Sequence, residues 1–212
     1  MKVTKYEHSC MVVQQASESI VIDPGVFSTV LSDVKDVVAV VITHEHPDHW
    51  TPEHLRRILD VNPNARVFAP VGVAKAAPEF EIDVVAPGDT VDAGGFVLRF
   101  FGGTHAEIHR SIPLIDNVGV LVNDQFFYGG DSLFVPKGVP IDTLAVPAGA
   151  PWLKIGEVID FVEAVAPKRS FPAHEMVLSV AGKQMANGRI QAATESGGGE
   201  FFPLEPGDTL DL

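Results

Sequence analysis

Short runs of β-branched and other apolar residues recur along the chain, and glycines and prolines fall between them. In several runs the apolar residues follow one another without polar alternation, which is typical of strands buried on both faces. The pattern predicts strands over 19–23, 37–43, 96–101, 118–122 and 143–146, with a short terminal strand around 201–204.

Two helices are predicted from a different spacing. Residues 154–166 carry apolar side chains three and four positions apart, which indicates an amphipathic helix that ends before Pro167. A second helix opens at Thr51, a typical N-cap residue, with Pro52 at its first position and Glu53 near the positive end of the helix dipole. Its apolar face would consist of Leu55, Ile58 and Leu59. This order of elements favours an α/β sandwich in which helices cover the sheets.

The composition fits one domain without a disulfide framework. The chain has 212 residues, of which 46% are hydrophobic, and one cysteine. It can therefore bury an ordinary core but cannot form an internal disulfide. The longest purely apolar run, 37–42, is far shorter than the roughly 20 residues that cross a bilayer. The N-terminal residues also lack the apolar stretch of a secretory signal. We expect a single domain over 1–212 that is cytoplasmic and engages no membrane.

The charge balance bears on the partners of the protein. The formal net charge is −13, and the basic residues are scattered rather than gathered in one stripe. A nucleic-acid binder normally carries a basic patch that displaces counterions from the phosphates. Nucleic acid is therefore a disfavoured partner, and a small-molecule substrate is the expected one. The charge leaves open whether the chain forms a homo-oligomer.

A segment reading His-Glu-His-Pro-Asp-His directly follows the most apolar of the predicted strands. In an extended chain His44 and His46 point to the same side, because side chains alternate, so both can chelate one ion. Pro47 turns the chain and aims Asp48 and His49 at a second position beside the first. Imidazole and carboxylate are ligands that zinc and other first-row metal ions prefer. The segment therefore predicts a metal site.

Four further motifs accompany this segment. They are Asp23 in Ile-Asp-Pro-Gly, His105 in Gly-Gly-Thr-His, Asp131 in Gly-Gly-Asp-Ser and His174 in Pro-Ala-His. Together with the H-x-H-x-D-H signature, their type and order resemble the metallo-β-lactamase-fold hydrolases. The resemblance covers residues 1 to about 175 and implies an α/β fold of four layers, an αβ/βα sandwich.

The resemblance also implies a pair of bound divalent ions, zinc in the first place, with manganese and iron as alternatives. A hydroxide bridging the two ions would attack a lactone, another ester or a phosphoester, so no side-chain nucleophile is required. Asp48 is the catalytic carboxylate in this assignment, and Asp23 would fix the ligand loop by hydrogen bonds. His44, His46 and His105 would hold the first ion, Asp48, His49 and His174 the second, and Asp131 would bridge the two.

Four other side chains are candidates for a substrate pocket. His109 lies four residues after His105 in the same loop and could replace it as the ligand, although the Gly-Gly-Thr-His context favours His105. His8, at the end of the first strand, either lines the pocket or is a hydrogen-bonded structural residue. Arg110 could clamp a carboxylate or phosphate, or simply lie exposed. Trp152 could form an apolar wall, or pack under the helix that follows it.

Differences between this sequence and several branches of the family exclude those branches. Only 38 residues follow His174, too few for the helical domain of glyoxalase II, and His46 stands where flavodiiron oxidoreductases have glutamate. Zinc β-lactamases are exported, and one subclass has a late cysteine ligand, whereas Cys10 is early. The compact hydrolases similar to ascorbate-6-phosphate lactonase remain. The alternative function is that of a mononuclear iron dioxygenase or a non-catalytic metal-binding protein of the same fold.

Overall fold

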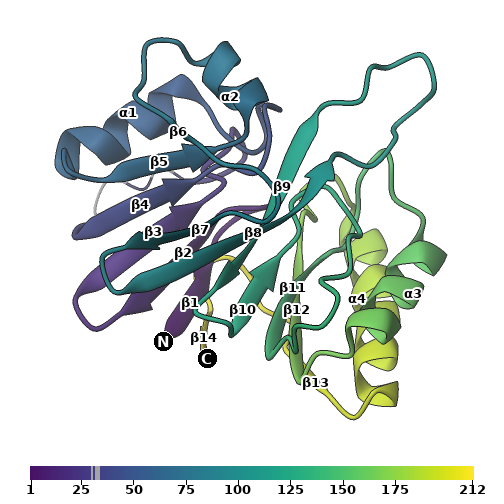
Figure 1. The fold of residues 1–212 in the computed structure, drawn as a ribbon. Coiled ribbons are helices and arrows are strands. Elements are labelled where there is room, and N and C mark those ends of the chain that lie inside the picture. Colours follow the sequence, from purple (N-terminus) through teal and green to yellow (C-terminus); the bar gives the residue numbers. More distant parts are fainter. Residues whose placement is uncertain (30, 32–33) are drawn as a thin grey trace.

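Two mixed β-sheets pack face to face, and helices flank each sheet on its outer side (Figure 1). The computed structural model describes residues 1–29, 31 and 34–212. Within them, the first sheet contains β1 (Lys2–Lys5), β2 (Met11–Gln15), β3 (Glu18–Ile22), β4 (Val37–Val41), β5 (Arg66–Ala69), β6 (Asp83–Val84) and β14 (Thr209–Asp211). The second sheet contains β7 (Thr90–Ala93), β8 (Phe96–Thr104), β9 (Asp116–Val122), β10 (Phe126–Tyr128), β11 (Thr143–Pro147), β12 (Arg169–Ala173) and β13 (Glu200–Phe201). The strand orders are β14-β1-β2-β3-β4-β5-β6 and β13-β12-β11-β10-β9-β8-β7.

Hydrophobic clusters fill the three spaces between the four layers. The central cluster joins the inner faces of the two sheets. A second cluster lies between the first sheet and the helices α1 (Pro52–Val61) and α2 (Val71–Ala76). A third lies between the second sheet and the helices α3 (Ile155–Val165) and α4 (Val180–Ser196). The predicted four-layer αβ/βα sandwich is therefore confirmed.

The continuous apolar run at β4 follows from its place between two of these clusters. Ala39 and Val41 belong to the central cluster, whereas Val40 and Ile42 belong to the cluster under α1 and α2. Because successive side chains point to opposite faces, a strand covered on both sides needs apolar residues at every position. This strand leads directly into the His-rich segment.

The two predicted helices are confirmed. The Thr51 side chain accepts a hydrogen bond from the His54 backbone N–H at 3.1 Å, and Leu55 and Ile58 are buried. The helix α3 lies within the predicted range, with Lys154 as its N-cap and Ala166 as a left-handed C-cap. No helix in the described part of the chain is long and apolar enough to cross a membrane.

Several elements differ from the sequence-based expectation. The strand β8 continues to Thr104 because Gly102 and Gly103 pair with β9, at φ values of 85° and 133° that glycine adopts without strain. The terminal strand β13 starts and ends earlier than expected, and the proline at 203 has no N–H for a ladder. The helix α4 was not predicted, because its glycines and small buried residues give a weak helical period.

A buried ion pair joins the first strand to the loop after β12. The Lys5 ammonium donates to the Glu175 carboxylate and to the Tyr6 carbonyl, the latter at 3.0 Å. The Lys5 side chain is 0% exposed and that of Glu175 1%. Removing one member of such a pair leaves an unpaired charge away from water.

Glu175→Ala should therefore lower the free energy of unfolding of the metal-free protein by about 3–5 kcal/mol, because Lys5 loses its counter-charge. Denaturant unfolding measures this. Glu205→Ala is the matched control, since its partner Lys183 is 20% exposed and Glu205 is 59% exposed. The control should lose no more than about 1 kcal/mol. Equally small losses of unfolding free energy in both variants would show that the buried ion pair contributes no more to stability than the exposed one.

Candidate metal centre

The candidate ligands lie in loops that follow the strands of both sheets, at one end of the sandwich. The segment 44–49 follows β4, and His105 follows β8. Asp131 follows β10, and His174 follows β12. All these loops leave the same edge of the two sheets, so residues far apart in the sequence meet there.

The first group consists of His44, His46, His105 and Asp131, whose ligand atoms all lie within 4.8 Å of one another. His44 Nε2 is 3.1 Å from His46 Nδ1, and His105 Nε2 is 3.3 Å from Asp131 Oδ2. His46 is half-buried and the other three are buried. This set matches the first predicted ion site.

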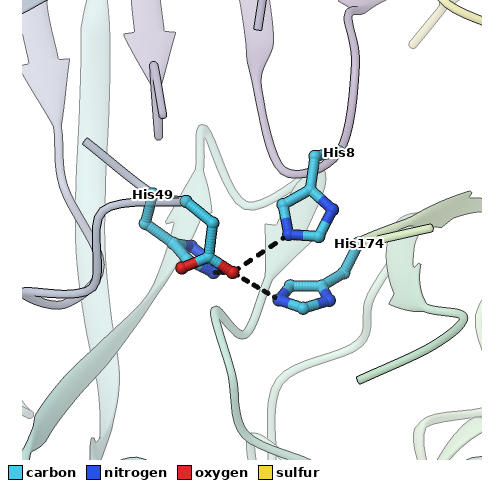
Figure 2. Close-up of side chains that lie close together, drawn as sticks. His8, His49 and His174 are labelled. Carbon is cyan, nitrogen blue, oxygen red and sulfur yellow. Dashed lines mark hydrogen bonds and ion pairs between the residues drawn. The ribbon is translucent and has the colours of Figure 1, made fainter. Parts of the chain in front are cut away.

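The second group consists of His8, Asp48, His49 and His174, again with ligand atoms within 4.8 Å of one another. Figure 2 shows the three imidazole rings gathered around one point. His174 Nε2 is 3.6 Å from Asp48 Oδ2, and His49 Nε2 is 4.0 Å from the same oxygen. The second predicted ion site is thus brought together, with His8 in addition.

Asp131 lies between the two groups. Its Oδ2 atom is 3.3 Å from His105 Nε2 in the first group and 3.2 Å from His174 Nε2 in the second. Its Oδ1 atom is 3.2 Å from His49 Nε2. The carboxylate is therefore placed where it could touch an ion in either group, as expected of a bridging ligand.

Hydrogen bonds fix the orientation of three of the rings. His49 Nδ1 donates to Asp23 Oδ2 at 2.7 Å, and His174 Nδ1 donates to the Gly149 carbonyl at 2.7 Å. His105 Nδ1 donates to the carbonyl of Ala106 at 2.6 Å. Since Nδ1 carries the proton in these bonds, a neutral ring keeps the Nε2 lone pair free to point inward.

The ligand atoms that point into the centre show whether the residues present can bind a metal ion. The Nε2 atoms of His49, His105 and His174 and the Oδ1 atom of Asp131 are buried, and none has a hydrogen-bond partner within the described residues. Buried polar atoms are normally paired, because desolvation without a partner is costly. Four such atoms converging from imidazoles and a carboxylate fit first-row divalent ions.

Asp23 holds the ligand segment by hydrogen bonds to Thr43 and His49. It is fully buried and accepts from the Thr43 backbone N–H at 2.8 Å and from the Thr43 hydroxyl at 2.7 Å, in addition to His49. Burial raises the pKa of Asp23, and the His49 imidazole acts against that rise. Gly25 lets this loop approach, because a Cβ there would lie 1.8 Å from the Asp48 carbonyl oxygen. The geometry agrees with the predicted hydrogen-bonding role of Asp23.

The carboxylates and imidazoles of the site shift each other's pKa values. Burial alone would lower the pKa of His49, but Asp131 and Asp23 raise it well above the usual value. Burial also opposes the charge on His174, yet Asp131 raises its pKa to about 9. Burial acts to raise the pKa of Asp131, but His49 and His174 hold it well below its usual range. Without metal, the carboxylates therefore favour the protonated form of both rings, and the rings favour the ionised form of Asp131.

His8 belongs to the second group but is oriented as a hydrogen-bond donor to Asp48. It lies in the turn between β1 and β2, with φ at 60°, so the expectation that it ends the first strand is wrong. The Met176 backbone N–H donates to His8 Nδ1 at 3.3 Å, which leaves the proton of the neutral ring on Nε2. That atom lies 3.2 Å from Asp48 Oδ2. Burial lowers the pKa of His8 to about 4, so the ring is neutral at neutral pH and donates to Asp48.

The remaining candidates for a substrate pocket lie in different environments. His109 is exposed and its Nδ1 is 2.7 Å from the Ser111 hydroxyl, whereas His105 lies in the first group. Arg110 is exposed as well. Trp152 is 9% exposed and donates its indole N–H to Asp131 Oδ2 at 2.7 Å. Residue types alone did not indicate this bond, because nothing in the sequence pairs position 152 with 131.

Comparison with known proteins agrees with this geometry. The family described as the Beta-lactamase superfamily domain matches residues 2–174. The chain belongs to the metallo-β-lactamase superfamily. The protein Rv0786c of Mycobacterium tuberculosis is 36% identical over 200 residues, which cover 92% of this chain and 93% of that protein.

Solved structures establish the metallo-β-lactamase fold. Igni18, a novel metallo hydrolase of Ignicoccus hospitalis, is 19% identical with a TM-score of 0.74, covering 99% of this chain and 97% of its own. The metallo-β-lactamase fold protein YhfI of Bacillus subtilis is 17% identical with a TM-score of 0.77, covering 99% of this chain and 98% of its own. At these identities the likeness concerns the fold.

The choice between His105 and His109 is testable with single alanine variants. His105→Ala removes an inward Nε2 atom, so metal affinity should fall at least 10–100-fold, taking the loss of a supporting residue as the lower reference. His109→Ala is the matched control from the same loop and should retain the wild-type metal content. Elemental analysis after dialysis measures both, and the reverse ranking would move the ligand to position 109.

Proposed function

We propose that this metallo-β-lactamase superfamily protein is a metal-dependent hydrolase that binds two divalent ions and acts on a small-molecule ester, lactone or phosphoester. The observation that carries the proposal is the convergence of unpartnered buried nitrogen and oxygen atoms from two adjacent groups that share Asp131. Two adjacent cations need an anionic bridge to offset their repulsion, and Asp131 supplies one. One iron alone, as in a dioxygenase, would leave one group unused.

In this proposal the side chains of the protein hold the metal ions and the substrate, and none of them acts as the nucleophile. When bound, a pair of ions would supply an activated water and a Lewis acid for the oxygen of the scissile bond. The Cys10 thiol is fully buried, and burial raises its pKa to about 12, so it is not a thiolate nucleophile.

Two of the candidate ligands are partly exposed. The Asp48 side chain is 26% exposed and His46 is half-buried, whereas His44, His49, His105, Asp131 and His174 are buried. Substrate would therefore approach over Asp48 and His46. Although burial acts to raise the pKa of Asp48, the neighbouring His174 and the hydrogen-bonded His8 lower it below the usual value, so the carboxylate is ionised where substrate arrives. This position supports the predicted catalytic role of Asp48.

The proposal is tested on purified protein that has been stripped of metal and reloaded with zinc, manganese or iron. We expect two equivalents of metal per chain and metal-dependent hydrolysis within a panel of lactones, thioesters and phosphodiesters. Lactones come first, because the compact chain resembles the ascorbate-6-phosphate lactonases. One iron per chain with oxygen consumption would support the dioxygenase instead, and metal binding without turnover would support a non-catalytic role.

Metal binding should release protons. His49 and His174 have raised pKa values in the metal-free protein, so a cation must displace a proton from each ring at neutral pH. Apparent metal affinity should therefore rise with pH towards the raised pKa values and fall as the solution is acidified. Titration calorimetry in buffers of different ionisation enthalpy measures the released protons. Binding heats that do not depend on the buffer would show that these rings are neutral before metal arrives.

A further inference from the structure

The indole of Trp152 lies directly against the candidate metal centre. Its Nε1–H donates to Asp131 Oδ2 at 2.7 Å, and Trp152 is 9% exposed. The ring stands edge-on to His105 and His174, with centroid separations of 6.0 Å and 6.3 Å. It therefore contacts a member of each group as well as the carboxylate between them.

The hydrogen bond falls on the carboxylate oxygen that lies near a ring of each group. Oδ2 is the atom of Asp131 that lies near both His105 and His174, at 3.3 Å and 3.2 Å from their Nε2 atoms. A free carboxylate can turn about its Cβ–Cγ bond, which exchanges the places of its two oxygens. A donor on a packed ring restricts that turn and occupies one Oδ2 lone pair, while the others remain available to metals.

The loop that presents Trp152 is itself anchored to a candidate ligand. The Ala148 backbone N–H donates to the Ala173 carbonyl at 2.8 Å, and the Gly149 carbonyl accepts from His174 Nδ1 at 2.7 Å. A Cβ at Gly149 would lie 2.5 Å from Leu178, so glycine permits this close packing. The loop thus sets the positions of His174 and Asp131 together.

We propose that Trp152 is a positioning residue, whose indole N–H holds the Asp131 carboxylate in the orientation that serves both metal groups. The inference rests on the proposed two-ion centre. Without the N–H, Asp131 would populate other orientations and hold the more weakly bound ion less often. That ion belongs to the second group, where a partly exposed Asp48 takes the place of the third imidazole ligand in the first group.

Trp152→Phe removes the donor but keeps an aromatic ring at the site. Phe161→Leu is the packing control, because this buried ring is 4% exposed in the cluster under α3 and belongs to neither group. Stepwise titration with zinc against a competing chelator measures each affinity. Wild-type protein must first bind two ions, which tests the proposed function separately. In Trp152→Phe the second ion should then bind roughly 10–100-fold more weakly, with the first little changed. Phe161→Leu should keep both affinities.

Spectroscopy separates positioning from packing. With cobalt in place of zinc, the absorption bands of the second equivalent should differ between Trp152→Phe and wild type, and those of the first should not. In the wild-type protein, the Trp152 indole N–H resonance should shift when metal is added, which requires no variant to fold. The proposal would be overturned by wild-type affinity for both ions in Trp152→Phe, or by equal losses in Phe161→Leu. An indole resonance that does not shift when metal is added would also overturn it.

Discussion

A buried carboxylate surrounded by imidazoles is the constraint on which the rest of this structure depends. The Asp131 side chain is 4% exposed, and its two oxygens lie close to His49, His105 and His174. An ionised group so far from water is stable only beside positive charge and donors. His49 and His174 favour the ionised carboxylate without metal, and divalent ions would supply positive charge when bound.

This constraint also joins the two halves of the sandwich. His44, Asp48 and His49 come from a loop of the first sheet, whereas Asp131 and His174 come from loops of the second. The Lys5–Glu175 ion pair links the same two sheets next to His174. Assembling the site therefore requires both sheets to pack together, because neither sheet carries a complete group.

Much of the fold and the set of side chains at the site could be predicted from the sequence, for identifiable reasons. The run at β4 is apolar at every position because clusters cover both of its faces, and the ligand segment follows it directly. The helix α4 was missed because its buried positions, among them Ala186 and Ala193, are small and its glycines weaken the period.

The orientation of the site residues could not be predicted in the same way. The donor role of His8 depends on the Met176 backbone N–H, and the His174 ring is fixed by the backbone carbonyl of Gly149. Backbone partners leave no signal in residue types. The bond from Trp152 to Asp131 joins two loops whose approach is set by packing rather than by a local pattern. Metal ligation by the assembled residues stays a prediction.

Anomalous diffraction from crystals of zinc-loaded protein tests the central claim most directly. We expect two anomalous peaks roughly 3.5–4 Å apart. One peak would lie among His44, His46 and His105, and the other among Asp48, His49 and His174, with Asp131 touching both. A single peak, or two peaks that Asp131 does not join, would contradict the account.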